Sequence, residues 1–357
     1  MTPPVRFAVV GAGFRARAFL RLAAALPERF DVVAVLPHHP ASARQDPTLA
    51  DLVVDDLAGL AARQPAFVLT AVAAEANATT SAELLERRIP VLAETPAAAD
   101  LDGLRRLWDA TGGSDLVQIA EQYPRHPMTA ARIAAIRSGR IGTPTSATVS
   151  IAQSYHAVAV LRAVLGVDLA GAEVRAVVQR APLVAPRSRA GWTGDAEEHE
   201  TASVLATLDF GDALGVYDFT DGQTRNPLRT TRFLARGSRG EIVDDRVVSL
   251  VDATTVVESP LVRRVIGADR DFETPDLEHI ALDGEALVRN PFVGARLSDD
   301  EIAMAELLAA MGRFASDDGP APYPLADGAQ DQLLGLAIQQ AADTGDTVRV
   351  DPEAWAR

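Results

Sequence analysis

The sequence predicts an α/β protein: a parallel sheet with helices in the first third of the chain, then a second α/β region with an antiparallel or mixed sheet. Three observations support this prediction. Short β-branched runs alternate with longer amphipathic segments from Val5 to about Ala120, a glycine turn follows the first run, and alternating strands dominate after Ala120. The 357 residues suffice for two domains, which we expect at residues 1–121 and 122–357.

The first predicted domain opens in the order strand, glycine turn, helix, strand. Buried strands are expected at Val5–Val10, Asp31–Leu36, Ala66–Val72, Pro90–Glu94 and Asp115–Ala120. In the first helix Phe19, Leu22, Ala23 and Leu26 fall on one face, and Pro27 closes the helix. Strands that alternate with helices in this way are typical of βαβ units on a parallel sheet.

The second predicted domain combines helices with long alternating strands. Helices are expected at Pro127–Ser138, Tyr155–Leu165, Asp299–Phe314 and Asp327–Asp343. Strands are expected at Glu200–Phe210, Ala213–Phe219 and Thr230–Arg236. Their alternation favours an antiparallel or mixed sheet with one packed face, which the last two helices would cover or brace.

The composition excludes several classes of chemistry. The chain contains 34 arginines and no lysine. Schiff-base enzymes, pyridoxal phosphate enzymes and lysine-containing phosphate loops are therefore excluded. The absence of cysteine excludes disulfides, thiol nucleophiles and cysteine-ligated metals, and it fits a reducing cytoplasm. A net charge of -15 disfavours nucleic acid and anionic membranes as partners. We expect a soluble, cytoplasmic protein without a metal site.

The glycine turn matches the dinucleotide-binding pattern G-x-G-x-x-[GA]. It reads GAGFRA between a predicted strand and a predicted helix. Gly11 permits the tight turn, Gly13 lets backbone N–H groups approach a pyrophosphate, and Ala16 lets the helix pack closely on the strand. The sequence therefore predicts a Rossmann domain, in which the residues beside the pyrophosphate are Gly11, Gly13, Phe14 and Arg15.

The residues after the second strand bear on the choice between NAD and NADP. An NAD site usually has an Asp or Glu there, which grips the ribose hydroxyls, whereas this chain has Leu36, Pro37, His38 and His39. A missing carboxylate removes repulsion toward a 2′-phosphate, and His38, His39 or Arg44 could supply donor groups. We expect NAD or NADP with a slight preference for NADP. The alternative is a solvated histidine pair and a loose preference.

Several stretches, in matching order and spacing, resemble the glucose-fructose oxidoreductase, inositol dehydrogenase and MocA family. They are GAGFRA at 11–16, PVLAETP at 90–96, AEQYPRHP at 120–127, SGRIGTP at 138–144, SYHAVAVLRAVLG at 154–166 and GSRGEI at 237–242. The resemblance implies an N-terminal Rossmann domain joined to a C-terminal α/β domain with a large open, mostly antiparallel sheet. It also implies a homodimer or homotetramer that associates through the second domain.

The resemblance places the family's Glu-Lys-Pro motif at Glu94, Thr95 and Pro96, which would flank the nicotinamide ribose. The family lysine contacts both cofactor and substrate hydroxyl. Thr95 can donate one neutral hydrogen bond but brings no charge to stabilise an alkoxide. Gln122 stands where the family has an asparagine just past the domain switch, and the resemblance implies that it contacts the cofactor. Asn77 stands where members often carry a histidine.

His156 matches the family histidine that accepts the substrate proton. The aspartate that members carry four residues earlier is Ala152 here. Ser154 is the expected N-cap of the helix, which would place His156 in the first turn, where the helix N-terminus disfavours a protonated imidazole. Tyr155 or Tyr123 would assist. The alternative reading of His156 is a hydrogen-bonded structural residue.

The function expected from these residues and this resemblance is that of an NAD(P)-dependent oxidoreductase. It would oxidise a CH–OH group of a sugar, cyclitol or related polyol, or reduce the corresponding carbonyl. Two alternatives remain open. One is a catalytically weakened dinucleotide-binding sensor or partner protein of the same fold, and the other is a glycosyl-transforming enzyme that uses tightly bound NAD transiently.

Overall fold

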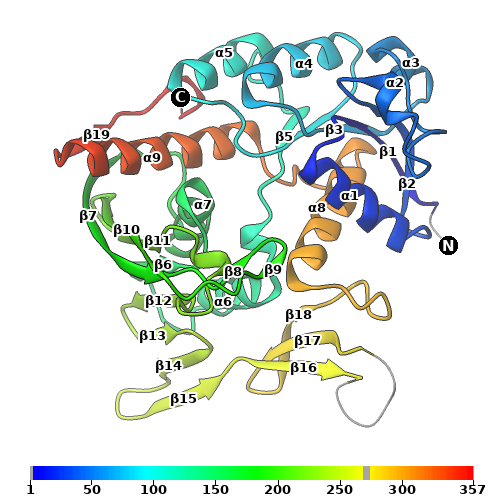
Figure 1. The fold of residues 1–357 in the computed structure, drawn as a ribbon. Coiled ribbons are helices and arrows are strands. Elements are labelled where there is room, and N and C mark those ends of the chain that lie inside the picture. Colours follow the sequence, from blue (N-terminus) through cyan, green and yellow to red (C-terminus); the bar gives the residue numbers. More distant parts are fainter. Residues whose placement is uncertain (1–2, 268–273, 357) are drawn as a thin grey trace. The chain divides into compact units, whose positions relative to one another are not determined.

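The computed structural model describes residues 3–267 and 274–356, which form two compact units (Figure 1). Of the described residues, unit 1 contains 3–126, 274–276 and 291–329. Unit 2 contains 127–267, 277–290 and 330–356. The chain therefore returns to unit 1 after building much of unit 2. The two units are compact groups of residues and do not test whether independently folding domains meet between residues 121 and 122, so that boundary stays a prediction.

Unit 1 is built on a parallel five-stranded sheet in the order β2-β1-β3-β4-β5. The strands are β1 (Val5–Val10), β2 (Phe30–Leu36), β3 (Phe67–Thr70), β4 (Val91–Ala93) and β5 (Val117–Ile119). The helices between them are α1 (Phe14–Ala25), α2 (Pro40–Ala43), α3 (Leu57–Ala62), α4 (Ala74–Glu86) and α5 (Leu101–Thr111). All five predicted strands are present and parallel. Their apolar runs are continuous because helices cover both faces of the sheet.

Helix α1 packs against this sheet through the face that the sequence predicts. Ala16, Phe19, Leu22 and Ala23 are buried, and they share one apolar core with residues of β1, β2 and β3. The helix ends at Ala25, two residues before a proline, as expected. This packing fixes where the first turn of α1 lies relative to the carboxyl ends of the strands.

Helix α8 (Asp299–Ala315) belongs to unit 1, although it lies near the end of the chain. It begins with a capping box between Ser298 and Glu301. A Cβ at Gly312 would lie 2.5 Å from a methyl group of Val5, so the glycine lets the helix pack closely on β1. The expectation that α8 braces the second sheet is therefore wrong, because its apolar face completes the core of the first.

Unit 2 contains a nine-stranded sheet in the order β15-β14-β13-β12-β6-β11-β10-β7-β19. Its strands are β6 (Pro144–Ser150), β7 (Ala172–Val184), β10 (Glu198–Asp209), β11 (Leu214–Thr220), β12 (Arg232–Gly237), β13 (Gly240–Val243), β14 (Arg246–Leu250), β15 (Val256–Pro260) and β19 (Val348–Val350). Neighbouring strands are antiparallel except for the pair β6 and β11. The predicted large, mostly antiparallel sheet is thus confirmed.

The remaining strands and α-helices of the described part of the chain lie outside the two large sheets. They are the hairpin of β8 (Arg187–Ser188) and β9 (Gly191–Trp192), the sheet of β16 (Val262–Ile266), β17 (Asp276–Leu282) and β18 (Glu285–Arg289), and the helices α6 (Pro127–Arg137), α7 (Ser154–Leu165) and α9 (Leu325–Thr344). In unit 2, α7 packs on β6 and β11. Within residues 3–267 and 274–356, no helix combines the length and the apolar character that a membrane crossing requires.

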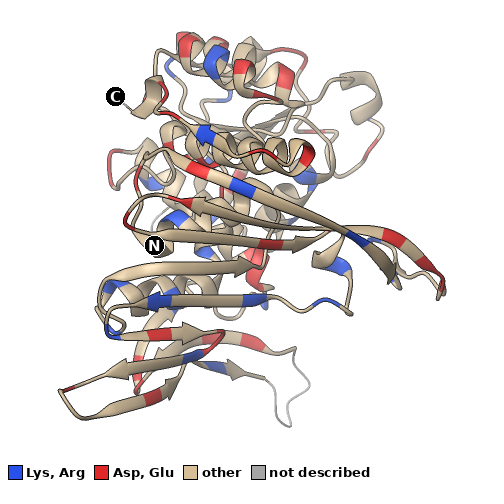
Figure 2. Cartoon of the chain, turned by 90° about the vertical axis from the view of Figure 1, so that its left-hand side faces the viewer, with Lys and Arg blue, Asp and Glu red and all other residues tan. Residues whose placement is uncertain are grey.

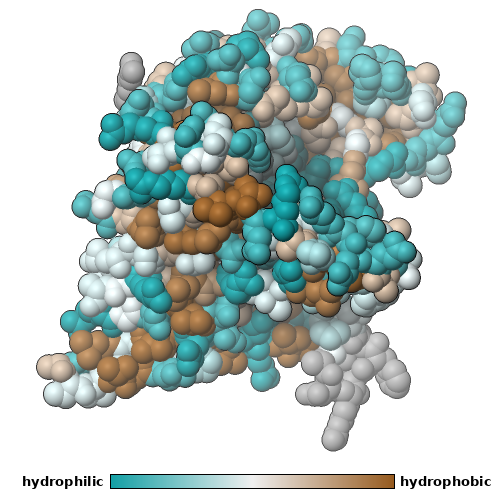
Figure 3. Space-filling model, turned by 60° about the vertical axis from the view of Figure 1, so that its left-hand side comes forward, coloured by the Kyte–Doolittle hydropathy of each residue, from teal (hydrophilic) through white to brown (hydrophobic). Residues whose placement is uncertain are grey.

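The other face of the nine-stranded sheet is exposed and mixed in character. Val177 of β7 and Leu205 of β10 lie directly opposite each other and are 68% and 52% exposed. Ion pairs join strands on the same face: Arg232 of β12 pairs with Asp218 of β11 across β6, and Arg236 of β12 pairs with Glu241 of the adjacent β13. Figure 2 shows charges of both signs along these strands, and Figure 3 shows apolar patches among hydrophilic side chains. The face is therefore less apolar than the alternation of residues suggests.

Candidate functional site

A groove of about 680 Å³ opens at the carboxyl ends of β1, β2 and β3 in unit 1. Its lining residues are Val10, Gly11, Ala12, Gly13, Leu36, Pro37, His38, Ala71, Val72, Ala73, Ala76 and Thr80. The chain runs from β1 to β2 on one side and places β3 on the other, so the groove lies at the switch point of the sheet. Parallel α/β sheets bind ligands at such a point.

The two glycines of the turn have different physical roles. Gly11 has φ +114°, and a Cβ there would lie 2.3 Å from the carbonyl oxygen of Ala71, so any side chain would collide with backbone. Gly13 is the N-cap of α1, and a Cβ there would meet no atom within 4 Å. No side chain caps this helix, so its first N–H groups are accessible to an anion. This cradle fits the pyrophosphate of a dinucleotide.

The end of β2 contributes His38 and no carboxylate to the groove. His38 lines the groove, and its ring lies 4.4 Å from that of His39, measured between centroids. None of the lining residues is acidic. Arg44, the third candidate for a 2′-phosphate, forms an ion pair with Asp55 at 2.8 Å. The histidine is thus the polar group that β2 offers to a ribose.

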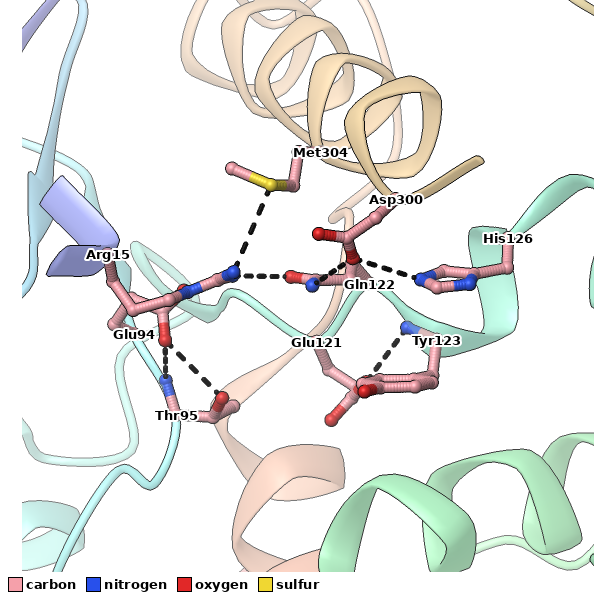
Figure 4. Close-up of polar contacts among 9 residues, drawn as sticks. All are labelled: Arg15, Glu94, Thr95, Glu121, Gln122, Tyr123, His126, Asp300 and Met304. Atoms are coloured by element: carbon pink, nitrogen blue, oxygen red, sulfur yellow. Dashed lines mark hydrogen bonds and ion pairs between the residues drawn. The ribbon is translucent and has the colours of Figure 1, made fainter. Parts of the chain in front are cut away.

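Arg15 is not among the groove-lining residues and reaches instead to the carboxyl end of β4 (Figure 4). Its Nε donates to Oε1 of Glu94 at 2.7 Å, and its Nη2 lies 2.6 Å from the same oxygen. Nη2 also donates to Oε1 of Gln122 at 2.7 Å. Burial opposes the charge of Arg15, but Glu94, together with Asp300 and Tyr123, offsets this effect, and the pKa of Arg15 is raised.

The hydrogen-bond chain continues from Gln122 to α8. Nε2 of Gln122 donates to Oδ1 of Asp300 at 2.8 Å, and Nε2 of His126 lies 3.2 Å from the same oxygen (Figure 4). His126 chiefly, together with Arg15 and Gln122, lowers the pKa of Asp300 despite its partial burial. The ring of Tyr123 stacks on that of His126 with centroids 4.8 Å apart. One network therefore connects α1, β4, the segment after β5, and α8.

Glu94 also orders the residue that follows it. Its second oxygen, Oε2, accepts hydrogen bonds from the backbone N–H of Thr95 at 2.9 Å and from its hydroxyl at 3.4 Å. The peptide bond between Thr95 and Pro96 is cis. Asn77 donates to the carbonyl oxygen of Ala97 at 3.0 Å and ties this turn to α4. Thr95 is thus held by backbone and side chain at the end of β4.

Tyr155 and His156 lie in unit 2, in the first turn of α7. Their ring centroids are 4.4 Å apart. The expectation that Ser154 caps this helix is wrong: the N-cap is Gln153, and Ser154 is the first helical residue with φ +47°. The N–H of Ser154 donates to the hydroxyl of Tyr217 at 3.2 Å, which anchors the start of the helix on β11. Burial raises the pKa of Tyr217 to about 12.

The predicted site residues of unit 1 fall into two groups. Gly11, Gly13 and His38 line the groove. The residues of the polar network are Arg15, Glu94, Thr95 and Gln122. Phe14 lies between the groups in sequence and is 58% exposed.

Sequence reasoning missed the contributions of Asp300 and His126. His126 stands inside one of the quoted stretches, but 178 residues separate Asp300 from its partner Gln122, and no local pattern connects them. His199 of the acidic segment forms a pair with Asp195 at 3.0 Å. Within the described residues, no group of three or more His, Asp or Glu residues has the arrangement of a metal site.

Comparison with known proteins supports this description of unit 1. Residues 5–120 match the family model of the Gfo/Idh/MocA proteins, described as an oxidoreductase family with an NAD-binding Rossmann fold. No curated protein is a significant match to the chain.

Solved structures share the fold over nearly the whole chain. An oxidoreductase from Agrobacterium radiobacter, in complex with NAD+, L-tartaric acid and magnesium, is 16% identical with a TM-score of 0.68 and covers 96% of this chain and 98% of its own. Levoglucosan dehydrogenase, in complex with NADH and levoglucosan, is 18% identical with a TM-score of 0.67 and covers 97% and 99%. A myo-inositol dehydrogenase from Corynebacterium glutamicum is 19% identical with a TM-score of 0.65 and covers 98% and 100%. At such identities the likeness establishes the fold.

The geometry of the glycine turn predicts that Gly13→Val abolishes dinucleotide binding without unfolding the protein. The new side chain has room on the protein side, because its Cβ meets no atom within 4 Å, but it would occupy the space that a pyrophosphate needs. Calorimetry with NADH and NADPH measures the binding, and thermal unfolding measures the stability. Gly11→Val is the contrasting variant, which we expect to lose stability as well. Undiminished nucleotide affinity in Gly13→Val would contradict the assignment of the groove.

Proposed function

Because residues 5–120 match the family model of the Gfo/Idh/MocA oxidoreductases with their NAD-binding Rossmann fold, we propose that the chain is an NAD(P)-dependent oxidoreductase acting on a sugar, cyclitol or related polyol. The reaction is oxidation of a CH–OH group or the reverse carbonyl reduction. The observation that carries the proposal is the groove at the uncapped N-terminus of α1. Levoglucosan dehydrogenase and myo-inositol dehydrogenase, which share the fold, are named for substrates of this class.

The residues of unit 1 have distinct roles in this proposal. A bound nicotinamide supplies the hydride acceptor or donor of the reaction. Gly11 and Gly13 bind the pyrophosphate, and Phe14 borders it. Glu94, Thr95 and Pro96 flank the ribose on the nicotinamide side, and Gln122 holds the network that positions Glu94 through Arg15. The Thr95 hydroxyl offers one hydrogen bond to a substrate oxygen.

His156 is the proposed proton acceptor, with Tyr155 or Tyr123 as its assistant. A neutral imidazole suits removal of a hydroxyl proton near neutral pH. The position of His156 in the first turn of α7, next to Tyr155, supports this role. The rival proposal is a dinucleotide-binding sensor, which the lack of a lysine in the chain favours.

For the cofactor we propose NAD or NADP, with a slight preference for NADP. The absence of a carboxylate from the lining of the groove supports this choice, since a carboxylate would repel a 2′-phosphate. NADPH should therefore bind at least as tightly as NADH, as measured by calorimetry. His38→Asp should reverse the order, whereas His39→Asp should change it less, because only His38 lines the groove. A native protein that clearly favours NADH would contradict the preference.

Loss of His156 separates the enzyme from the sensor. His156→Ala should leave NADH affinity nearly unchanged and lower turnover by about 10²–10⁴-fold, the typical contribution of a positioned base. A panel of sugars and cyclitols, assayed by the absorbance of the reduced cofactor, measures turnover. His199→Ala, which removes an exposed histidine elsewhere in unit 2, is the control. Native turnover that survives the loss of His156 would remove it from the mechanism, and no turnover with any substrate would favour the sensor.

We further propose that the protein is a homodimer or homotetramer that associates through the exposed face of the nine-stranded sheet. The opposed pair Val177 and Leu205 places two exposed apolar side chains side by side on that face. Sedimentation should then give a multiple of 37.8 kDa at micromolar concentration. Leu205→Glu should produce monomers, whereas Val262→Glu, on the smaller sheet, should not. A native monomer would overturn the proposal.

A further inference from the structure

The proposed reaction needs positive charge or hydrogen-bond donors near the reacting oxygen. Removing a proton from an alcohol, or adding hydride to a carbonyl, builds negative charge on that oxygen, and preorganised donors stabilise it. Thr95 supplies one neutral donor at the end of β4, and the chain contains no lysine. A charged group at this end of the sheet must therefore be an arginine or a protonated histidine.

Arg15 and Thr95 both bind the carboxylate of Glu94, so they lie close to each other. Its guanidinium binds Oε1 of Glu94, while Thr95 binds Oε2 of the same carboxylate (Figure 4). The two residues thus occupy the two oxygens of one side chain that is only 7% exposed. A guanidinium remains charged at every pH at which the protein is folded, and its planar fork is suited to such fixed contacts. The cation is therefore permanent and oriented.

One edge of the guanidinium has capacity for another hydrogen bond. Nε and Nη2 are engaged by Glu94 and Gln122, whereas the contact of Nη1 within the described residues is with the sulfur of Met304 at 3.9 Å. A thioether sulfur is a weak acceptor. The side chain of Arg15 is 31% exposed, so part of it is open to solvent and to a ligand. The guanidinium is thus fixed by Glu94 and Gln122 and keeps hydrogen-bond capacity at Nη1.

We propose that Arg15 supplies the fixed positive charge of the active site at the end of β4, beside Thr95, and that it acts on the nicotinamide and on the substrate oxygen. The inference rests on the proposed function, since it concerns the same site. Oxidised nicotinamide carries a positive charge and reduced nicotinamide does not. Removing the guanidinium while Glu94 remains makes the site more negative by one charge, so it favours the oxidised form.

The first test measures nucleotide binding and needs no substrate. Calorimetry gives the affinities of the native protein, Arg15→Met and Arg15→Gln for NAD+ and NADH. Both variants should shift the ratio of the two affinities toward NAD+ by about three- to thirtyfold, as expected for the loss of one nearby charge. Arg21→Met removes an exposed arginine from the same helix and should leave the ratio unchanged. Circular dichroism and thermal unfolding show whether each variant is folded, and Arg15→Gln replaces Arg15→Met if the latter is not.

The second test transfers the positive charge from position 15 to position 95, which binds the other oxygen of Glu94. In the native protein Thr95→Lys should lower turnover, because a second cation crowds a site already built around Arg15. In the Arg15→Met background the same substitution should raise turnover, because the ammonium takes over the charge. Such a reversal of sign is a coupling that independent residues do not show.

The outcomes distinguish this inference from the proposed function. If the native protein binds neither nucleotide, the proposed function fails. If both nucleotides bind and the Arg15 variants keep the native NAD+ to NADH ratio, the inference is overturned and the oxidoreductase proposal stands. Additive effects of Arg15→Met and Thr95→Lys on turnover would overturn it as well. A shifted ratio supports it even where the native protein shows no turnover.

Discussion

The arrangement of the candidate site depends on the ion pair between Arg15 and Glu94. Glu94 directly follows β4 with its carboxylate almost wholly buried, and a buried carboxylate is costly unless it is paired and hydrogen-bonded. Arg15, in the first turn of α1, meets this need and at the same time binds Gln122. The glycine turn, the end of β4 and the segment after β5 are thereby tied together by one guanidinium. Each of them contributes residues to the proposed cofactor and substrate site.

The electrostatics of unit 1 explain how an acidic protein can hold an anionic cofactor. The net charge of -15 opposes such binding at long range. At short range, however, the groove is lined by glycines, small apolar residues and His38, and it ends at the uncapped N-terminus of α1. The positive end of the helix and its free N–H groups act within the first turn, where a pyrophosphate would lie. Local backbone geometry therefore outweighs the overall charge.

In unit 2, polar contacts at both ends hold the proposed catalytic helix α7 in place. Arg162 of α7 forms an ion pair with Asp331 of α9 at 2.6 Å, and both side chains are buried. At the other end of α7, the hydroxyl of Tyr217 accepts the N–H of Ser154. The covered face of the sheet packs on the same helix, with Tyr217 and Phe219 among its buried residues. The first turn, which carries His156, is thus fixed by contacts at both ends of the helix.

The sequence by itself determined the elements whose signal is local. Short continuous apolar runs located every strand of the parallel sheet, and the glycine turn located the groove, where Gly11 admits no side chain next to Ala71. The tertiary structure alone decided that α8 completes the core of unit 1, that Asp300 meets Gln122, and that Arg15 turns to Glu94 instead of lining the groove. The two hydrogen-bonded contacts join residues 79 and 178 positions apart, and α8 meets β1 across a still longer stretch of chain. Local patterns report which face of an element is buried, but only the packing of distant elements determines which side chain lies opposite it.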